Sequence, residues 1–140
     1  MLRLPMRKLL FFIVPCLVMF TLGGLWNSVL LAKIFASGAP SFARPPVEVK
    51  LGVIVIAYGL LTAFMAFLFS QSFPKKPGSL AGFQFGSLFG VIMTLPVYLL
   101  LYAVWDVSLA PLLVDAGWHA VEQGIGGVLM AALLVPRNSP

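Results

Sequence analysis

The sequence predicts an all-α integral membrane protein, and three observations support that fold class. Of the 140 residues, 61% are hydrophobic and only 9% are charged, which is far outside the range of soluble globular domains. No charged residue occurs over 9–32, 51–74 or 77–105. Each gap can hold a helix of about 20 residues, the length that crosses a hydrocarbon core of about 30 Å. With a further apolar run at 111–135, we expect four transmembrane helices in an antiparallel bundle.

The first helix is expected over 9–32, with Pro15 tolerated in its opening turns. Its apolar run is longer than the core of about 7 to 15 residues in a cleaved signal peptide, so the rival interpretation as a signal peptide is disfavoured. The next segment, "SGAPSFARPPVEVK", is rich in proline and small residues, and Pro45 and Pro46 exclude helix there. We therefore expect an outer loop over 37–48.

The second and third helices are expected over 49–70 and 79–102. Between them, "SFPKKPG" at 72–78 has the prolines and glycine of a tight turn, with two lysines that face the inner surface. The fourth helix, over 111–135, is the one that carries ionisable residues. Together the four helices are predicted to form a single transmembrane domain over residues 1–140.

The distribution of basic residues predicts that both termini lie in the cytoplasm. With the N-terminus inside, six basic residues are on the inner side and three on the outer side, in agreement with the positive-inside rule. The inner group is Arg3, Arg7, Lys8, Lys75, Lys76 and Arg137, and the outer group is Lys33, Arg44 and Lys50. These residues occur in ones and twos at the ends of apolar runs, so the net charge of +5 does not indicate a nucleic-acid partner.

The fourth helix has a polar stripe. Asp115, His119, Glu122 and Gly126 follow the i, i+4, i+7, i+11 pattern, which places them within a stripe about 60° wide on one helix face. A charged side chain inside a bilayer costs several kcal/mol, so such residues turn inward and find partners. We expect this stripe to face the other helices.

The third helix offers two complementary faces. Gly82, Gly86 and Gly90 recur every four residues, the glycine-zipper pattern that lets another backbone approach closely. Further round the helix lie Thr94 and Tyr98, which should be level with the polar stripe. The candidate polar cluster is Asp115, His119, Glu122, Thr94, Tyr98, Asn27 and Tyr58, and the candidate packing residues are Gly82, Gly86, Gly90 and Gly126. Trp26, Trp105 and Trp118 are expected in an outer interfacial belt.

Two interpretations of the cluster remain open from the sequence. It is either an interhelical hydrogen-bond network, or an outward-facing polar cavity that accepts a proton, a cation or a small polar ligand. A metal or haem site is disfavoured because the chain has a single histidine, His119. No catalytic motif accompanies these residues, so we predict no enzymatic activity and no cofactor.

Two stretches resemble a known family. "LGGLWNSVLLAKIFA" at 22–36 contains Gly23, Trp26 and Lys33, and "VDAGWHAVEQGIGG" at 114–127 contains the run from Ala116 to His119. Both are similar to segments of a family of small, uncharacterised bacterial four-helix membrane proteins, a domain of unknown function. The resemblance implies the fold and a multi-pass location in the bacterial inner membrane, and it implies no activity.

The expected function is therefore that of a helix-packing or interaction protein, or an accessory subunit, of the inner membrane. The alternative is a small transporter or a proton- or cation-linked carrier that uses the polar cavity. The expected partners are the lipid bilayer and either further copies of the chain or a larger membrane complex.

Overall fold

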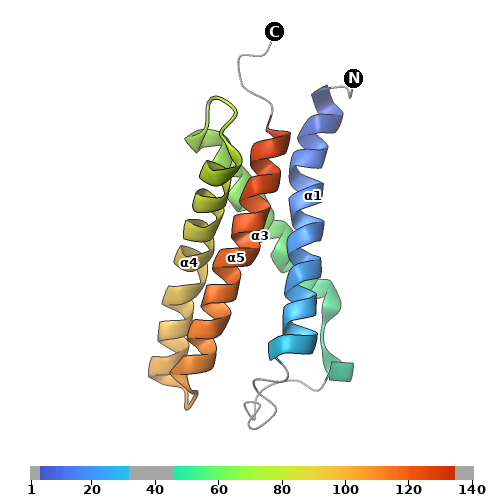
Figure 1. Ribbon diagram of the computed structural model, residues 1–140. Coiled ribbons are helices and arrows are strands. Elements are labelled where there is room, and N and C mark those ends of the chain that lie inside the picture. The colour runs from blue at the N-terminus through green and yellow to red at the C-terminus, as the bar shows by residue number, and fades with distance from the viewer. Residues whose placement is uncertain (1–3, 32–45, 135–140) are drawn as a thin grey trace.

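The computed structural model describes residues 4–31 and 46–134, and within these two stretches the chain is helical and contains no strand. This confirms the predicted all-α class. Four long α-helices account for most of it (Figure 1): α1 (Leu4–Leu25), α3 (Leu51–Ser72), α4 (Ser79–Val104) and α5 (Leu109–Leu133). A π-helix, η1 (Trp26–Leu31), continues α1, and a short 3₁₀ helix, η2 (Pro46–Glu48), precedes α3.

The expected first helix differs most from the observed one. It begins at Leu4 rather than near Leu9, and it changes from α to π geometry at Trp26. At this change, Asn27 Nδ2 donates to Gly23 O (2.8 Å) and Ser28 Oγ donates to Gly24 O (2.7 Å). Side chains that bond to the carbonyl four residues back compete with the regular helical bonds and alter the helix locally.

The connecting segments also require a correction. Pro46 was expected to exclude helix, but it begins the 3₁₀ turn of η2, a position where proline is tolerated because its missing N–H has no intrahelical acceptor. The remainder of the expected outer loop, 37–45, lies outside the described residues, as do Lys33 and Arg44. The expected turn at 72–78 is present between α3 and α4, with α3 ending at Ser72.

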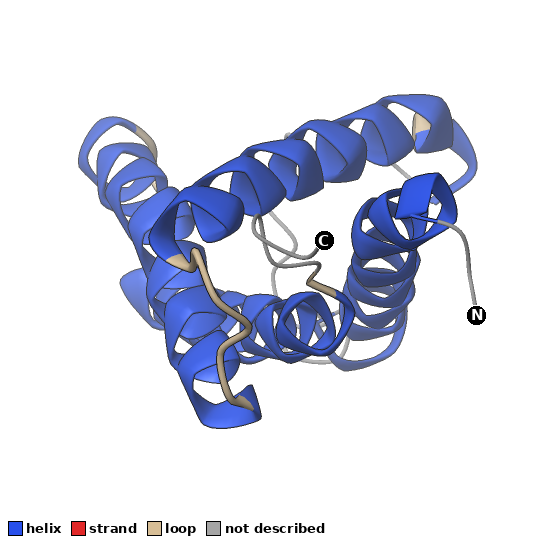
Figure 2. Ribbon diagram, turned by 90° about the horizontal axis from the view of Figure 1, so that it is seen from above, coloured by secondary structure: helices blue, strands red, loops and turns tan. Residues whose placement is uncertain are grey.

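Helix α5 lies between α1 and α4, with α3 behind it (Figure 1). The view from above shows the long helices grouped side by side (Figure 2). The start of α1, the turn between α3 and α4, and the end of α5 lie at one end of the bundle, whereas the turn between α4 and α5 lies at the other (Figure 1). Helices that follow one another in sequence are therefore antiparallel.

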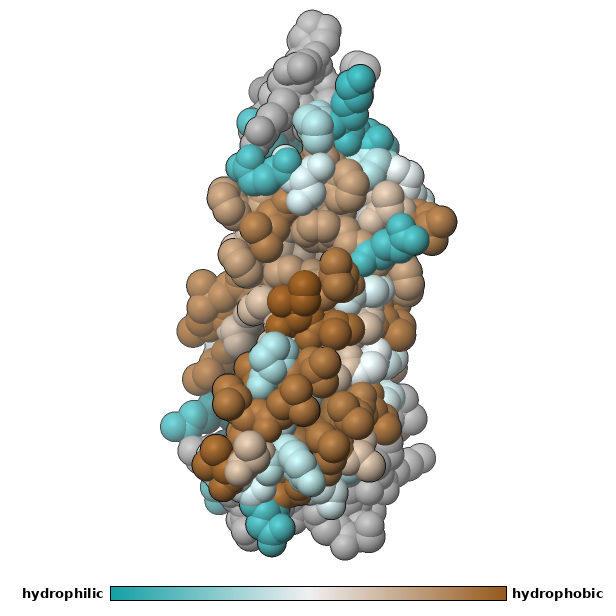
Figure 3. Space-filling view, turned by 90° about the vertical axis from the view of Figure 1, so that its left-hand side faces the viewer, coloured by the Kyte–Doolittle hydropathy of each residue, from teal (hydrophilic) through white to brown (hydrophobic). Residues whose placement is uncertain are grey.

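Within the part of the chain that the structure describes, three helices are long and apolar enough to cross a membrane by length and composition: Met6–Val29, Leu51–Ser72 and Ser79–Val104. Helix α5 carries the ionisable stripe and does not belong to this group. On the face shown in Figure 3, an apolar middle zone separates more hydrophilic ends. The outward apolar surface includes large exposed side chains such as Leu60, Leu88 and Leu100.

Glycines allow α4 and α5 to approach at backbone distance. A Cβ atom added at Gly86 would collide with the carbonyl of Gln123 and lie 2.9 Å from Gly124 Cα, and one added at Gly82 would lie 2.5 Å from Gly127 O. Gly90 lies in the same way against the carbonyl of His119. The predicted glycine face of α4 therefore meets α5 along its whole length.

Gly126 has a different role from the other predicted packing residues. A Cβ atom there would lie 2.5 Å from Met19 Sδ and 3.2 Å from Met19 Cγ, both on α1. Gly126 thus allows α1, not α4, to approach α5. The α5 glycines that receive α4 are Gly124 and Gly127, neither of which was among the predicted packing residues.

We predict that Gly86→Ala destabilises the protein, because the new methyl group meets backbone atoms that move only if α4 and α5 separate. The expected loss is about 1–3 kcal/mol, seen as a lower midpoint of thermal unfolding in detergent. Gly117→Ala is the matched control, because Gly117 on α5 has open space around its Cβ position. Equal midpoints for the two variants would show that the close approach at Gly86 contributes nothing.

Candidate functional site

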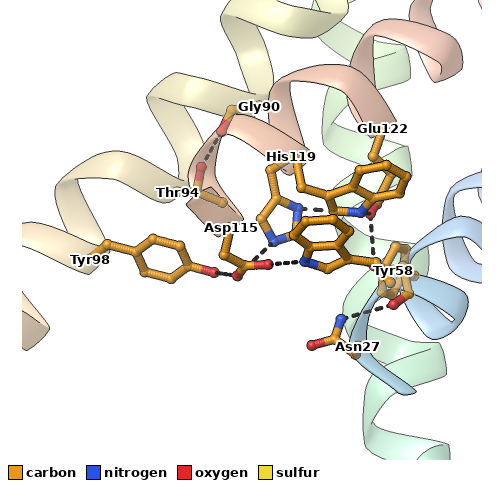
Figure 4. A network of polar contacts seen from close by, with 11 residues as sticks. Asn27, Tyr58, Gly90, Thr94, Tyr98, Asp115, His119 and Glu122 are labelled. Carbon is orange, nitrogen blue, oxygen red and sulfur yellow. Dashed lines mark hydrogen bonds and ion pairs between the residues drawn. The ribbon is translucent and has the colours of Figure 1, made fainter. Parts of the chain in front are cut away.

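Two carboxylates on α5 form the centre of a polar network. For Asp115, Trp26 Nε1 of η1 donates to Oδ1 (2.6 Å) and the Tyr98 hydroxyl of α4 donates to Oδ2. For Glu122, the Tyr58 hydroxyl of α3 donates to Oε2 at 3.4 Å. Each of the other three helical segments thus supplies one donor to α5, and Figure 4 shows the side chains converging from these elements.

His119 lies between the two carboxylates (Figure 4). Its Nε2 atom is 3.7 Å from Asp115 Oδ2, and its Nδ1 atom is 3.9 Å from Glu122 Oε2. Both distances are too long for good hydrogen bonds. The imidazole therefore attracts these carboxylates only when it carries a proton, so its protonation state sets the charge balance of the network.

Two tryptophans form a second connection between η1 and α5. The rings of Trp26 and Trp118 stack with centroids 4.6 Å apart and planes within 5° of parallel. Their indole N–H groups point to different carboxylates, because Trp118 Nε1 donates to Glu122 Oε2 at 3.1 Å while Trp26 donates to Asp115. The aromatic stack thus holds two of the donors in place.

The two carboxylates of the network are buried, whereas the aromatic groups around them are partly exposed. Glu122 has no exposed surface, and Asp115 is 9% exposed. Among the described residues, four buried polar atoms have no hydrogen-bond partner: Ser87 Oγ, His119 Nδ1, Glu122 Oε1 and Gln123 Oε1. A buried polar atom without a partner costs about 1–3 kcal/mol. Two of these atoms, on His119 and Glu122, belong to the ionisable stripe itself.

Five of the seven predicted cluster residues come together, namely Asp115, His119, Glu122, Tyr58 and Tyr98. The other two bond to their own helices: Thr94 Oγ1 donates to Gly90 O (2.5 Å), and Asn27 donates to Gly23 O. Thr94 was expected to lie level with the polar stripe and to belong to the cluster. Its hydroxyl instead makes the local bond to the carbonyl four residues back that threonine commonly makes in helices.

Sequence reasoning missed both tryptophans as members of the network. Trp26 and Trp118 were assigned only to an interfacial belt, although the i, i+4 spacing of Trp118 and Glu122 places them on one helix face. That spacing was an available signal. No such signal existed for Trp26, because its bond to Asp115 joins residues 89 positions apart in the sequence.

Within residues 4–31 and 46–134, no group of three or more histidine, cysteine, aspartate or glutamate side chains is arranged to hold a metal ion. The described lysines and arginines do not take part in the network. Its chemistry is therefore that of two carboxylates and one imidazole, held by tyrosine and indole donors in a low-polarity environment.

Comparisons with protein-family models, curated proteins and solved structures gave no significant match to this chain. The resemblance at 22–36 and 114–127 thus stays a prediction.

Proposed function

We propose that this chain is a four-span protein of the bacterial inner membrane, with both termini in the cytoplasm, that acts as a helix-packing and interaction protein or accessory subunit. Three apolar helices of membrane-spanning length support this placement. Helix α5 becomes a fourth span at low cost because its charged stripe faces the other helices, where each carboxylate accepts hydrogen bonds.

The charges at the two ends of the bundle support the proposed orientation. Arg7, Lys8, Lys75 and Lys76 lie at the end that holds the start of α1 and the turn between α3 and α4. The described charged residues near the opposite end are Glu48, Lys50 and Asp106. The first group is entirely positive, as expected for a cytoplasmic surface.

The observation that carries the interaction role is the convergence of one donor from each of η1, α3 and α4 on the carboxylates of α5. In this arrangement the intramembrane polar groups join helices to one another. The first two turns of α3 are exposed on every side, with Leu51 and Val53 each 60% exposed and Ile56 63% exposed. These first two turns of α3 form the surface that we propose for contact with a further copy or a larger membrane complex.

A second function, proton- or cation-linked transport, is favoured by one specific observation. Glu122 Oε1 and His119 Nδ1 are buried without a hydrogen-bond partner among the described residues. Two ionised carboxylates beside a neutral imidazole carry uncompensated negative charge, which is costly in a low-dielectric site. A bound proton or cation lowers that cost, so the stripe has the chemistry of a carrier site.

The orientation predicts which side of the membrane labels each turn. In a Cys16→Ser background, Lys75→Cys should react with an impermeant thiol reagent only after the membrane is opened, because its turn faces the cytoplasm. Asp106→Cys, in the opposite turn, should react in intact spheroplasts. The reverse pattern of labelling, or labelling of both variants from one side, contradicts the four-span orientation.

Glu122→Gln separates the two functions. Gln keeps the shape and accepts the bonds from Tyr58 and Trp118 but does not titrate, so in a packing protein we expect a change in unfolding free energy below about 1 kcal/mol. Proton or cation flux into vesicles should then be at background for wild type and variant alike. Asp106→Asn, outside the network, controls for the loss of a carboxylate. Flux that is present in the wild type and the Asp106→Asn variant, and lost in Glu122→Gln, contradicts the packing role and supports the carrier.

A further inference from the structure

An apolar groove lies between α3 and α4, on the side of α4 away from the polar network. It has a volume of about 240 Å³ and is lined only by apolar side chains, among them Phe64 and Leu68 of α3 and Phe85, Leu88 and Ile92 of α4. The rings of Phe64 and Phe89, whose centroids are 5.9 Å apart, form one contact between the two helices in this region, and the rings of Phe69 and Phe85, at 5.1 Å, form another. The groove has no polar group that could orient a polar ligand.

In the proposed membrane placement, the groove lies at the depth of the acyl chains. With a rise of 1.5 Å per residue, it extends from about 9 Å below Ser79, at Phe85, to about 21 Å below it, at Met93. Half of a hydrocarbon core measures about 15 Å. The part of the groove from Phe85 to about Phe89 therefore lies alongside the acyl chains of the leaflet whose surface is at the turn between α3 and α4, and the rest extends past the middle of the core.

The turn at this end of the groove carries two uncompensated positive charges. Lys75 and Lys76 are both exposed, and the sequence contains no aspartate or glutamate over 51–105. The four acidic residues of the chain lie elsewhere: Glu48 and Asp106 near the opposite end of the bundle, and Asp115 and Glu122 in the buried network. A phosphate group held at this turn meets cations without a competing carboxylate.

We propose that the groove and the Lys75–Lys76 turn together bind one anionic phospholipid, with an acyl chain along the groove and the phosphate headgroup at the two lysines. The charge of the turn selects the headgroup, because lysines next to the membrane attract anionic lipids. This inference rests on the proposed membrane placement, which puts the groove in the lipid and the turn at its surface.

A second protein helix fits the groove poorly. Close helix association in membranes is favoured by small residues at the contact, but this rim is formed by bulky side chains, with Leu88 61% and Ile92 59% exposed. The glycines of α4 face α5 instead. A flexible acyl chain can follow an irregular apolar groove and fill it. A rigid helix would lie across the rim and leave the groove empty.

Native mass spectrometry of the detergent-purified protein tests the proposal. The protein is given equal amounts of phosphatidylglycerol and phosphatidylcholine with identical acyl chains, and the retained lipid is counted per chain. We expect one retained lipid, with a preference for the anionic headgroup on the order of tenfold. Lys75→Gln with Lys76→Gln should abolish this preference, whereas Arg7→Gln with Lys8→Gln, two cations removed at the same end, should keep it.

The groove is tested separately by Leu88→Trp, which fills it from its exposed rim and is expected to lower retention of both lipids at least severalfold. Ile92→Trp repeats this test in a second position, and circular dichroism verifies that each variant is folded. Equal retention of the two lipids by the wild type, loss of preference in the Arg7 and Lys8 variant, or full retention in both tryptophan variants overturns the proposal. Since retention in detergent does not depend on orientation, these outcomes are distinct from a failure of the thiol-labelling test.

Discussion

The structure depends on the burial of two carboxylates on α5. Asp115 and Glu122 lie in α5, which packs against α1 and α4. A carboxylate buried between helices is not stable without hydrogen-bond donors. Three donors come from other helical segments: Trp26 from η1, Tyr58 from α3 and Tyr98 from α4. This requirement fixes the rotation of α5 and places it between α1 and α4.

The two halves of the bundle are held together in different ways. The half with the α4–α5 turn contains the polar network and the stacked tryptophans. The other half contains an apolar core that includes Met19, Met65, Phe69 and Met130, each with no exposed surface. The aromatic contacts of Phe69 with Phe73 and Phe85, at 4.8 and 5.1 Å, close that end below the lysine turn. A network that stops at such a core is better suited to joining helices than to passing an ion across the membrane, which is why we place interaction before transport.

The sequence predicted the helices well because charge-free apolar runs and proline-rich breaks are local signals. The polar stripe was also predictable, since 3.6-residue periodicity alone brings Asp115, His119 and Glu122 to one face. The residues that contact this stripe were less predictable. Thr94 donates its hydrogen bond to a carbonyl of its own helix, and Gly126 packs against α1 rather than α4. The bond from Trp26 was not predictable, because it joins residues 89 positions apart in the sequence and depends on how η1 and α5 lie in three dimensions.

A double-mutant cycle between Tyr98 and Asp115 tests the central claim most directly. The unfolding free energy in detergent is measured for the wild type, Tyr98→Phe, Asp115→Ala and the double variant, with Tyr102→Phe in place of Tyr98→Phe as the control because Tyr102 is 49% exposed. If buried carboxylates on α5 hold the helices together, the Tyr98 and Asp115 effects should differ from additivity by about 0.5–1.5 kcal/mol, and the Tyr102 pair should be additive. Additive effects within about 0.3 kcal/mol for both pairs would contradict the claim.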